Sequence, residues 1–160
     1  MRIAGIVKDS IVDGEGIRDV VFLQGCCHRC KGCHNKETWE YNGGITVTPK
    51  YLIDKLSKSS NDITISGGEP LLQFTQLMNF VELVRLYTKK RVWLYTGFKF
   101  EDVPTSMWMA LSQYVDVVVD GAFECDKKDK NLLFRGSSNQ RIIDLRKSLG
   151  KESVVEWELE

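Results

Sequence analysis

Four short runs of branched and aromatic residues, each ending in glycine or a polar residue, constrain this fold most strongly. The runs span 18–25, 62–66, 91–97 and 115–121. Patterns typical of helices lie between the last three, over 71–90 and 103–114, and another follows the first run, over 48–59. Strands that alternate with helices form right-handed crossovers and a parallel sheet.

The number of strand–helix units decides between a closed and an open barrel. Fewer than the eight units of a full barrel are present, so the sequence predicts an α/β fold built as a partial, open βα barrel with parallel strands and crossover helices. Thr48 and Pro49 suit the N-cap and first position of their helix, and 153–160 is a candidate for a last strand. Residues 1–160 are expected to form a single domain.

Charge and hydropathy set limits on partners and location. The chain has 22 Lys plus Arg and 22 Asp plus Glu, so electrostatics favour neither nucleic acid nor an anionic membrane as a partner. The sequence contains no apolar run of the roughly 18–20 residues that cross a bilayer. The N-terminus has no signal-peptide core, so we expect a cytoplasmic protein.

The ends of the predicted strands carry unusual residues. A strand ends near each of Gly25, Ser66, Thr96 and Asp120. Loops that follow the carboxyl ends of parallel strands share one face of the sheet, and sites are built there. The sequence therefore predicts one site mouth to which all four segments contribute.

Four of the five cysteines and both histidines lie in "GCCHRCKGCHN", residues 25–35. Thiols packed this closely suit disulfides poorly, and in a reducing compartment they are more often metal ligands. Cys27, Cys30 and Cys33 match the C-x2-C-x2-C opening of a ferredoxin run. That run needs a fourth cysteine followed by proline, and the sequence has none there.

A second register uses Cys26, Cys30 and Cys33, with the spacing C-x3-C-x2-C. Three thiolates can bind three irons of a [4Fe–4S] cluster and leave the fourth iron open, which distinguishes a catalytic centre from a closed structural one. A structural zinc site remains an alternative, because three cysteines and either His28 or His34 would complete a tetrahedron.

Six segments in order resemble a known family. They are "DGEGIR" (13–18), "FLQGCCHRCKGCHNKETW" (22–39), "SGGEPL" (66–71), "WLYTGFKFEDV" (93–103), "VDVVVDGAFE" (115–124) and "FRGSSNQRIIDL" (134–145). C-x3-C-x2-C followed by G-G-E-P resembles the radical S-adenosylmethionine (SAM) superfamily. The ordered set resembles its glycyl-radical activases, specifically the activators of anaerobic ribonucleoside-triphosphate reductases, over about residues 8–145.

The resemblance implies a fold of the radical SAM type and a set of cofactor ligands. Cys26, Cys30 and Cys33 would bind the cluster, and the amino and carboxylate groups of SAM would chelate the open iron. The G-G-E motif would receive the methionine amino group, with help from Ser66; its residues are Gly67, Gly68 and Glu69. Glycines allow close backbone approach, and a carboxylate accepts charge-assisted hydrogen bonds from an ammonium group.

The resemblance also implies which residues lie near the adenine and ribose of SAM. Gly32, Cys33 and His34 align with the segment along the adenine. Many members have an aromatic residue where Gly32 stands, so His34 or Trp39 would supply the flat surface instead. Thr96, with Gly97, would lie near the ribose or methionine, and Asp120 would close the same face.

Several residues of the matched segments have no assigned role. Arg18, in the motif with Asp13, Gly14 and Gly16, is either a site arginine or a surface ion-pair residue. Arg135, Ser137 and Gln140 would touch the partner or the site, or begin a polar helix. Cys27 and Cys125 are bystander thiols in this interpretation, and Trp93 and Trp108 are core residues.

The implied activity is reductive cleavage of SAM, giving a radical that removes a hydrogen from a glycine of a partner protein. The partner would be the glycyl-radical subunit of anaerobic ribonucleoside-triphosphate reductase, an external one-electron donor would be needed, and no catalytic residue is expected beyond the cluster and SAM ligands. Two alternatives remain: an activase of another glycyl-radical enzyme, of the formate-lyase type, and a non-catalytic zinc-binding interaction module. "SGGEP" argues against the zinc module, which has no need of an ammonium-binding glutamate.

Overall fold

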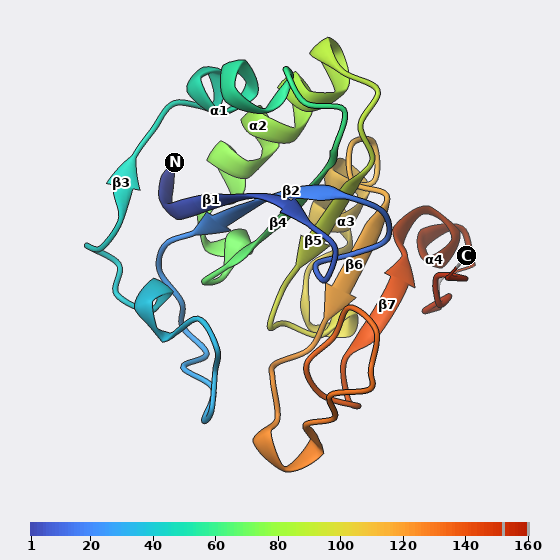
Figure 1. Ribbon diagram of the computed structural model, residues 1–160. Coiled ribbons are helices and arrows are strands. Elements are labelled where there is room, and N and C mark those ends of the chain that lie inside the picture. Colours follow the sequence, from blue (N-terminus) through green and yellow to red (C-terminus); the bar gives the residue numbers. More distant parts are fainter. Residues whose placement is uncertain (152, 160) are drawn as a thin grey trace.

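Seven strands form one open sheet in the order β3-β1-β2-β4-β5-β6-β7 (Figure 1). The structure is a computed structural model that describes residues 1–151 and 153–159. The strands are β1 (Arg2–Ser10), β2 (Arg18–Leu23), β3 (Ile45–Thr46), β4 (Asp62–Gly67), β5 (Val92–Tyr95), β6 (Val117–Asp120) and β7 (Arg141–Asp144). The α-helices are α1 (Pro49–Leu56), α2 (Phe74–Tyr87), α3 (Thr105–Leu111) and α4 (Leu145–Lys151).

The centre of the sheet is parallel and its two sides are antiparallel. β2, β4, β5 and β6 pair in parallel, whereas β1 pairs antiparallel with β2 and β3, and β7 antiparallel with β6. The parallel strands consist mainly of β-branched and other apolar residues that are buried on both faces, as in parallel sheets generally. The mixed α/β class and the four predicted strands are confirmed, and the sheet does not close.

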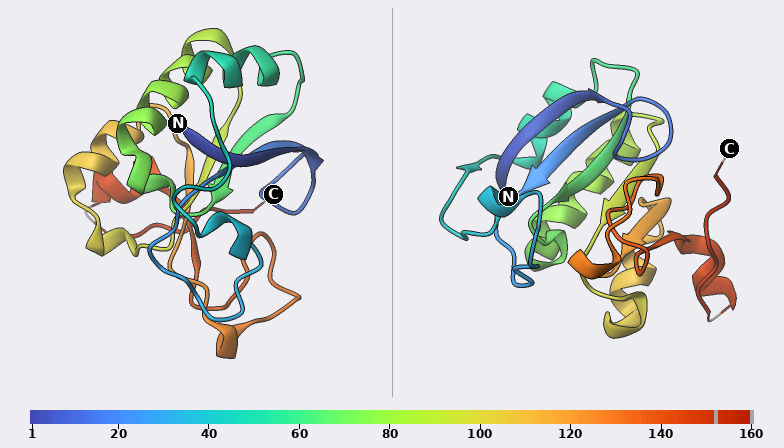
Figure 2. Two further views of the ribbon diagram at one scale, coloured as in Figure 1. Left: turned by 90° about the vertical axis from the view of Figure 1, so that its left-hand side faces the viewer. Right: turned by 60° about the horizontal axis from the view of Figure 1, so that its bottom comes forward.

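The helices cover one face of the sheet (Figure 2) and enclose the larger core with it. In α1 the Thr48 hydroxyl accepts a hydrogen bond from Tyr51 N at 3.1 Å and Pro49 occupies the first turn, as predicted. α2 begins at Phe74, after a 3-10 turn over Pro70–Gln73. None of the described helices is both long and apolar enough to cross a bilayer.

The opposite face of the sheet carries a smaller core. Trp93, Val117, Val119 and Ile142 are buried there, with Tyr95, Phe134 and Trp157 packed against them. Trp108 belongs to the larger core, beneath the helices. The prediction that Trp93 and Trp108 are core residues is confirmed, and each is 1% exposed.

The last part of the chain differs from the prediction. A helix does not begin in "RGSSNQ": Gln140 leads into β7, and the helix α4 starts only at Leu145. The expected final strand is also wrong over 153–159, where Glu156 forms a single bridge to Ile143, and residue 160 lies outside the described residues. The terminal segment lies along β7, where Asp144 N donates to Val155 O at 2.9 Å and Trp157 N to Ile142 O at 2.8 Å, but these contacts form only that one bridge.

Candidate functional site

The carboxyl ends of the parallel strands bring the predicted site segments together. Leu23 is paired with Gly67 at the ends of β2 and β4, and Tyr95 with Val119 near the ends of β5 and β6. The segments that follow β2 and β6 both lie at the lower end of the molecule in Figure 1. The four strand ends therefore share one edge of the sheet, as expected from the sequence.

The cysteine-bearing segment leaves β2 as a closed loop. Gly25 N donates to Thr38 O at 2.7 Å and Cys26 N to Trp39 O at 3.1 Å, so the two stems of the loop are hydrogen-bonded to each other. At its tip Cys33 N donates to Cys30 O at 3.1 Å. The loop is thus held at both its base and its turn.

The two candidate first ligands differ in environment. Cys26 is 8% exposed, at the base of the loop, whereas Cys27 is exposed. Cys30 and Cys33 are half-buried, and the Cys33 sulfur accepts a hydrogen bond from Asn35 N at 3.3 Å. Cys26 is therefore the buried thiol of the pair and Cys27 the exposed one.

The thiols influence each other's ionisation. Burial raises the pKa of Cys30, the backbone N–H of Phe123 lowers it, and the neighbouring Cys33 and Cys26 raise it again. Since a ligating cysteine must be a thiolate, a bound cation would offset these effects.

Among the described residues, no three His, Cys, Asp or Glu side chains converge closely enough to hold one metal ion. A [4Fe–4S] cluster makes a different demand, because each thiolate binds a separate iron at its own corner. Three half-buried or buried thiols on one loop form a donor set of the right chemistry for such a cluster.

Glu69 is the central polar residue beside this loop, and it is fully buried. Its Oε1 accepts from Leu71 N at 3.0 Å and from the Thr96 hydroxyl at 2.9 Å. Its Oε2 accepts from Gly97 N at 2.8 Å and from His28 Nε2 at 2.9 Å. Within the described chain, His28 is the one ion-pair partner of this carboxylate, and no lysine or arginine reaches it.

The glycines of the G-G-E motif are required by close packing. Gly68 N donates to Leu23 O and Glu69 N to Gly25 O, both at 2.8 Å, so the backbone runs against the base of the cysteine loop. A Cβ at Gly68 would overlap the Gly25 carbonyl oxygen. Gly67 has a φ of +101°, in the region that favours glycine.

The end of β5 completes this arrangement. Thr96 is 4% exposed, and its hydroxyl accepts from Phe98 N at 3.2 Å while donating to Glu69. A Cβ on Gly97 would lie 2.6 Å from His28 Nε2, so the missing side chain makes room for the imidazole. Thr96 and Gly97 therefore bind Glu69 directly.

Asp120 lies apart from these residues although it is also buried. Its carboxylate accepts from Arg141 through both oxygens and from Phe100 N at 2.7 Å. Arg141 also forms a bidentate pair with Glu101 at 2.8 and 2.9 Å. The structure thus uses Asp120 to connect β6 and β7 and does not bring it to Glu69.

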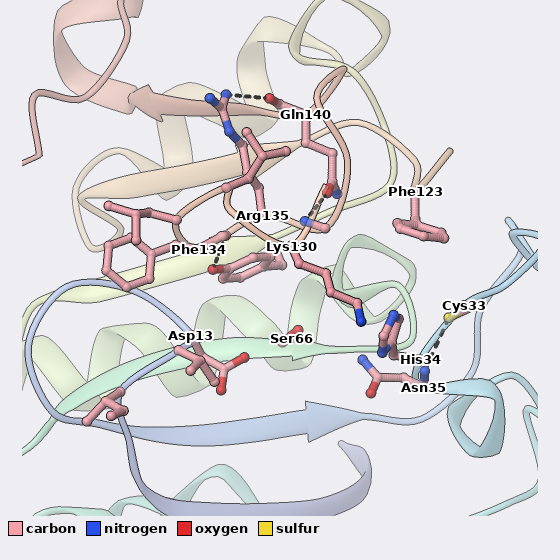
Figure 3. Close-up of a pocket in the computed structure, with 16 residues that line it drawn as sticks. Asp13, Cys33, His34, Asn35, Ser66, Phe123, Lys130, Phe134, Arg135 and Gln140 are labelled. Carbon is pink, nitrogen blue, oxygen red and sulfur yellow. Dashed lines mark hydrogen bonds between the residues drawn. The ribbon is translucent and has the colours of Figure 1, made fainter. Parts of the chain in front are cut away.

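A cavity of about 560 Å³ opens beside the cysteine loop (Figure 3). Cys33, His34 and Ser66, three of the residues expected to bind the cofactor, line it. Its other wall is the segment after β6, where the Tyr95 hydroxyl donates to Phe134 O at 2.6 Å. Burial, and then the charge of Asp13, raise the pKa of Tyr95, so this phenol stays protonated.

An aromatic ring does lie beside Gly32. A Cβ on Gly32 would be 3.5 Å from the Phe123 ring and 3.1 Å from the Cys125 sulfur. His34 is exposed and meets Phe123 edge-on, with ring centroids 6.0 Å apart. Sequence reasoning missed Phe123 and treated Cys125 as a bystander thiol, because both lie some 90 positions from the loop that they contact.

Arg18 lies away from the cysteines and is not a surface residue, but it does form an ion pair, with Asp62 at 3.6 Å. It is fully buried at the amino end of β2, where its guanidinium donates to Thr64 Oγ1 and Ile63 O, both at 2.7 Å. Burial lowers its pKa to about 10. A Cβ on Gly14 would lie within 2.9 Å of Arg18 and Trp93, so this part of the "DGEGIR" motif closes the end of the sheet away from the cysteines.

The "RGSSNQ" segment is a tight loop. Gln140 Oε1 accepts from Gly136 N at 2.8 Å and Ser137 N at 3.2 Å, while its amide donates to Gly121 O at 2.9 Å. Arg135 donates to Gln140 O at 2.9 Å (Figure 3). These contacts shape the cavity wall that faces the cysteines.

Sequence reasoning also missed the role of His28. It was considered only as a metal ligand, and the structure places it on Glu69 with its ring 4.5 Å from that of Phe98, edge-on. Glycine at position 97 is the one sequence signal that bears on this contact, and it is interpretable only once His28 is known to be adjacent.

Comparison with known proteins agrees with this geometry. A family described as a 4Fe-4S single cluster domain matches residues 12–143. An anaerobic ribonucleoside-triphosphate reductase-activating protein of Enterobacteria phage T4 is 40% identical over 138 residues, 82% of this chain and 86% of the relative. Proteins of the same name from Haemophilus influenzae and Escherichia coli K12 are 36% and 37% identical, over 82% and 85% of this chain and 90% and 94% of their own lengths.

The family match, over residues 12–143, spans the cysteine loop, the G-G-E turn and the end of β6 together. The chain therefore belongs to the 4Fe-4S single cluster domain family and, within it, to the family of anaerobic ribonucleoside-triphosphate reductase-activating proteins.

Proposed function

We propose that this protein is a [4Fe–4S]- and SAM-dependent activase that generates a glycyl radical on an anaerobic ribonucleoside-triphosphate reductase. Family membership supports the partner, because relatives of this length and similarity carry that name. The open sheet, with four parallel strands and helices on one face, is consistent with an incomplete barrel of the radical SAM type.

The observation that carries the proposal is Glu69. A fully buried carboxylate has lost its hydration and is normally paired with a cation. Glu69 has only hydrogen-bond donors and an imidazole around it in the described chain, and its backbone N–H is bonded to the base of the cysteine loop. An ammonium group held beside that loop would supply the cation.

Each part of the site has a role in this scheme. Cys26, Cys30 and Cys33 would hold three irons, leaving the fourth for the amino and carboxylate groups of SAM. Glu69 would orient the amino group. The chemistry that cluster and SAM supply when bound is one-electron cleavage of the sulfonium to methionine and a 5′-deoxyadenosyl radical, which takes a hydrogen atom from the partner's glycine.

The chain itself contributes placement and exclusion of water. The cavity beside Cys33 and Ser66 is large enough for a nucleoside, at about 560 Å³. Tyr95 holds Phe134 over one side of it, which narrows the access of water and oxygen to the cysteine loop. Phe123, beside Gly32, offers the aromatic surface for the adenine that the residue at position 32 does not supply.

The test is anaerobic reconstitution followed by assays for iron, sulfide and 5′-deoxyadenosine in the presence of dithionite and SAM. We expect about four irons per chain and SAM cleavage. Electron paramagnetic resonance of an anaerobic ribonucleotide reductase and of a formate-lyase-type enzyme, each incubated with the activase, would identify the partner. One zinc per chain with no iron and no SAM cleavage would overturn the proposal.

A matched pair of variants tests the ligand register. Cys26→Ala should abolish cluster binding, whereas Cys27→Ala should retain it, because the buried sulfur is at position 26. Iron and sulfide content of the two reconstituted variants gives the answer directly. Loss of iron in Cys27→Ala but not in Cys26→Ala would instead support Cys27, Cys30 and Cys33 as the ligands.

A further inference from the structure

The hydrogen-bonding capacity of Glu69 is already filled by the protein. A carboxylate offers about four lone-pair positions. Leu71 N and the Thr96 hydroxyl occupy those of Oε1, and Gly97 N and His28 Nε2 those of Oε2. An ammonium group that is to donate to this carboxylate must therefore take the place of one of the four donors.

Three of the four donors cannot move away easily. Leu71 N and Gly97 N belong to the backbone, at the first turn after β4 and the end of β5. The Thr96 hydroxyl is buried and is fixed from its other side by Phe98 N at 3.2 Å.

His28 is the movable donor. Its side chain is 17% exposed, whereas that of Glu69 is not exposed at all. It projects from the loop between Cys26 and Cys30. Its ring lies against the backbone of Gly97 and edge-on against the ring of Phe98. An ionised carboxylate only accepts hydrogen bonds, so Nε2 is the donor and the ring gives up one bond on leaving.

We propose that His28 occupies the position on Glu69 Oε2 that the amino group of SAM takes, and that the imidazole yields this position when SAM binds. The inference rests on the proposed function and adds a competing residue to it. Because His28 lies within the cysteine loop, this exchange links occupation of the amino-group site to a change in that loop.

The direction in which SAM affinity changes on removing His28 distinguishes competition from a supporting role. If His28 competes with the amino group, removing the imidazole tightens SAM binding. If His28 instead holds Glu69 or the loop in the binding-competent position, removing it weakens SAM binding. Only ligands with the amino group should respond.

The experiment measures equilibrium binding of SAM and of 5′-methylthioadenosine, which lacks the amino acid portion, to anaerobically reconstituted protein. His28→Ala removes the donor, and His28→Asn has an amide too short to reach Glu69. His28→Gln keeps an amide N–H at about the reach of Nε2. Lys31→Ala, an exposed change in the same loop, is the control.

We expect His28→Ala and His28→Asn to bind SAM about three- to tenfold more tightly, the worth of one net hydrogen bond. His28→Gln and Lys31→Ala should match the wild type, and 5′-methylthioadenosine should bind all variants equally. In the cluster-free protein, His28→Ala should unfold at lower urea than His28→Gln, because a buried carboxylate loses a donor.

Unchanged or weaker SAM binding in both His28→Ala and His28→Asn would overturn the inference, as would an equal shift for 5′-methylthioadenosine. Loss of iron from both variants would also overturn it, because the role of His28 would then be to organise the loop for cluster binding and not to compete with SAM. Failure of the proposed function is visible separately, as a wild-type protein that neither assembles a cluster nor cleaves SAM.

Discussion

Glu69 and Asp120 are two buried carboxylates at the same end of the same sheet, and their surroundings differ. Asp120 has a guanidinium on both oxygens, and a second carboxylate, Glu101, lies behind that guanidinium. Glu69 has amide, hydroxyl and imidazole donors and no lysine or arginine among the described residues. Asp120 is thus paired with an arginine, whereas Glu69 has only His28 as an ion-pair partner among the described residues, and in the proposed function the ammonium group of SAM would supply its cation.

The largest expected effect is on the Asp120 side. Arg141→Met leaves Asp120 buried without its cation and should destabilise the cluster-free protein by about 3 kcal/mol, as removing one partner of a buried pair does. Thr96→Val removes one neutral donor from Glu69 and should cost only about 1–2 kcal/mol. Urea unfolding of both variants measures the difference, and equal losses would contradict the distinction between the two carboxylates.

The next effect concerns SAM. Glu69→Gln removes the charge that an ammonium would meet and should weaken SAM binding at least tenfold, since hydrogen bonds to charged groups contribute about 1.5–3 kcal/mol. Asp120→Asn is the matched control, and any folded fraction should bind SAM like the wild type. Equilibrium dialysis on reconstituted proteins of equal iron content measures the SAM affinity of both variants. A larger loss in Asp120→Asn would return that residue to the cofactor site.

A third contrast uses the glycines next to the two carboxylates. Gly68→Ala forces a methyl group onto the Gly25 carbonyl, so the base of the cysteine loop must shift and iron uptake should fall. Gly121→Ala meets nothing closer than 3.7 Å but has a φ of +95°, so it should cost about 1 kcal/mol of stability through backbone strain. The iron content after reconstitution should therefore be low in Gly68→Ala and equal to that of the wild type in Gly121→Ala.

The smallest effect depends on pH. Arg141 lowers the pKa of Glu101 from 4.5 to about 2. The stabilisation is therefore present above about pH 4.5 and is lost as the pH falls from there towards 2. Because the Glu101 side chain is 56% exposed, solvent screening limits the contribution to at most about 1 kcal/mol.

Urea unfolding at pH 6 and pH 3.5 checks the Glu101 contribution. The wild type should lose more stability between these values than Glu101→Gln. A steeper loss in the variant would mean that other carboxylates, and not the Glu101–Arg141 pair, set the acid dependence of this side of the sheet.

The sequence was sufficient for the centre of the fold and for the position of the site. β4 and β6 are short buried runs of β-branched residues, and the capping of α1 follows from Thr48 and Pro49 alone. β1 and β7 were not predicted. Most of β1 is half-buried or exposed and lacks a continuous apolar run, and β7 has only four residues, two of them charged or polar ends around Ile142 and Ile143. Their pairing is decided by contacts with β2 and β6.

Within the site, residues near each other in sequence were easier to place than those brought together by folding. The C-x3-C-x2-C spacing and the G-G-E turn are local patterns. The contact of His28 with Glu69, the use of Asp120 by Arg141, and the position of Phe123 beside Gly32 all depend on chain segments far apart in sequence. A pattern of residue types does not specify which of several partners a buried charge selects.

The hydrogen-bonded base of the cysteine loop has a consequence for a protein that meets oxygen. Gly25 and Cys26 are tied to Thr38 and Trp39 by the backbone, and both apolar cores consist of sheet and helix residues. The loop ends are therefore joined by backbone hydrogen bonds as well as by any ligand that the cysteines hold. We expect a chain stripped of its metal to keep its shape and to accept a new cluster, so that exposure to air consumes iron and sulfide while the polypeptide remains available for repair.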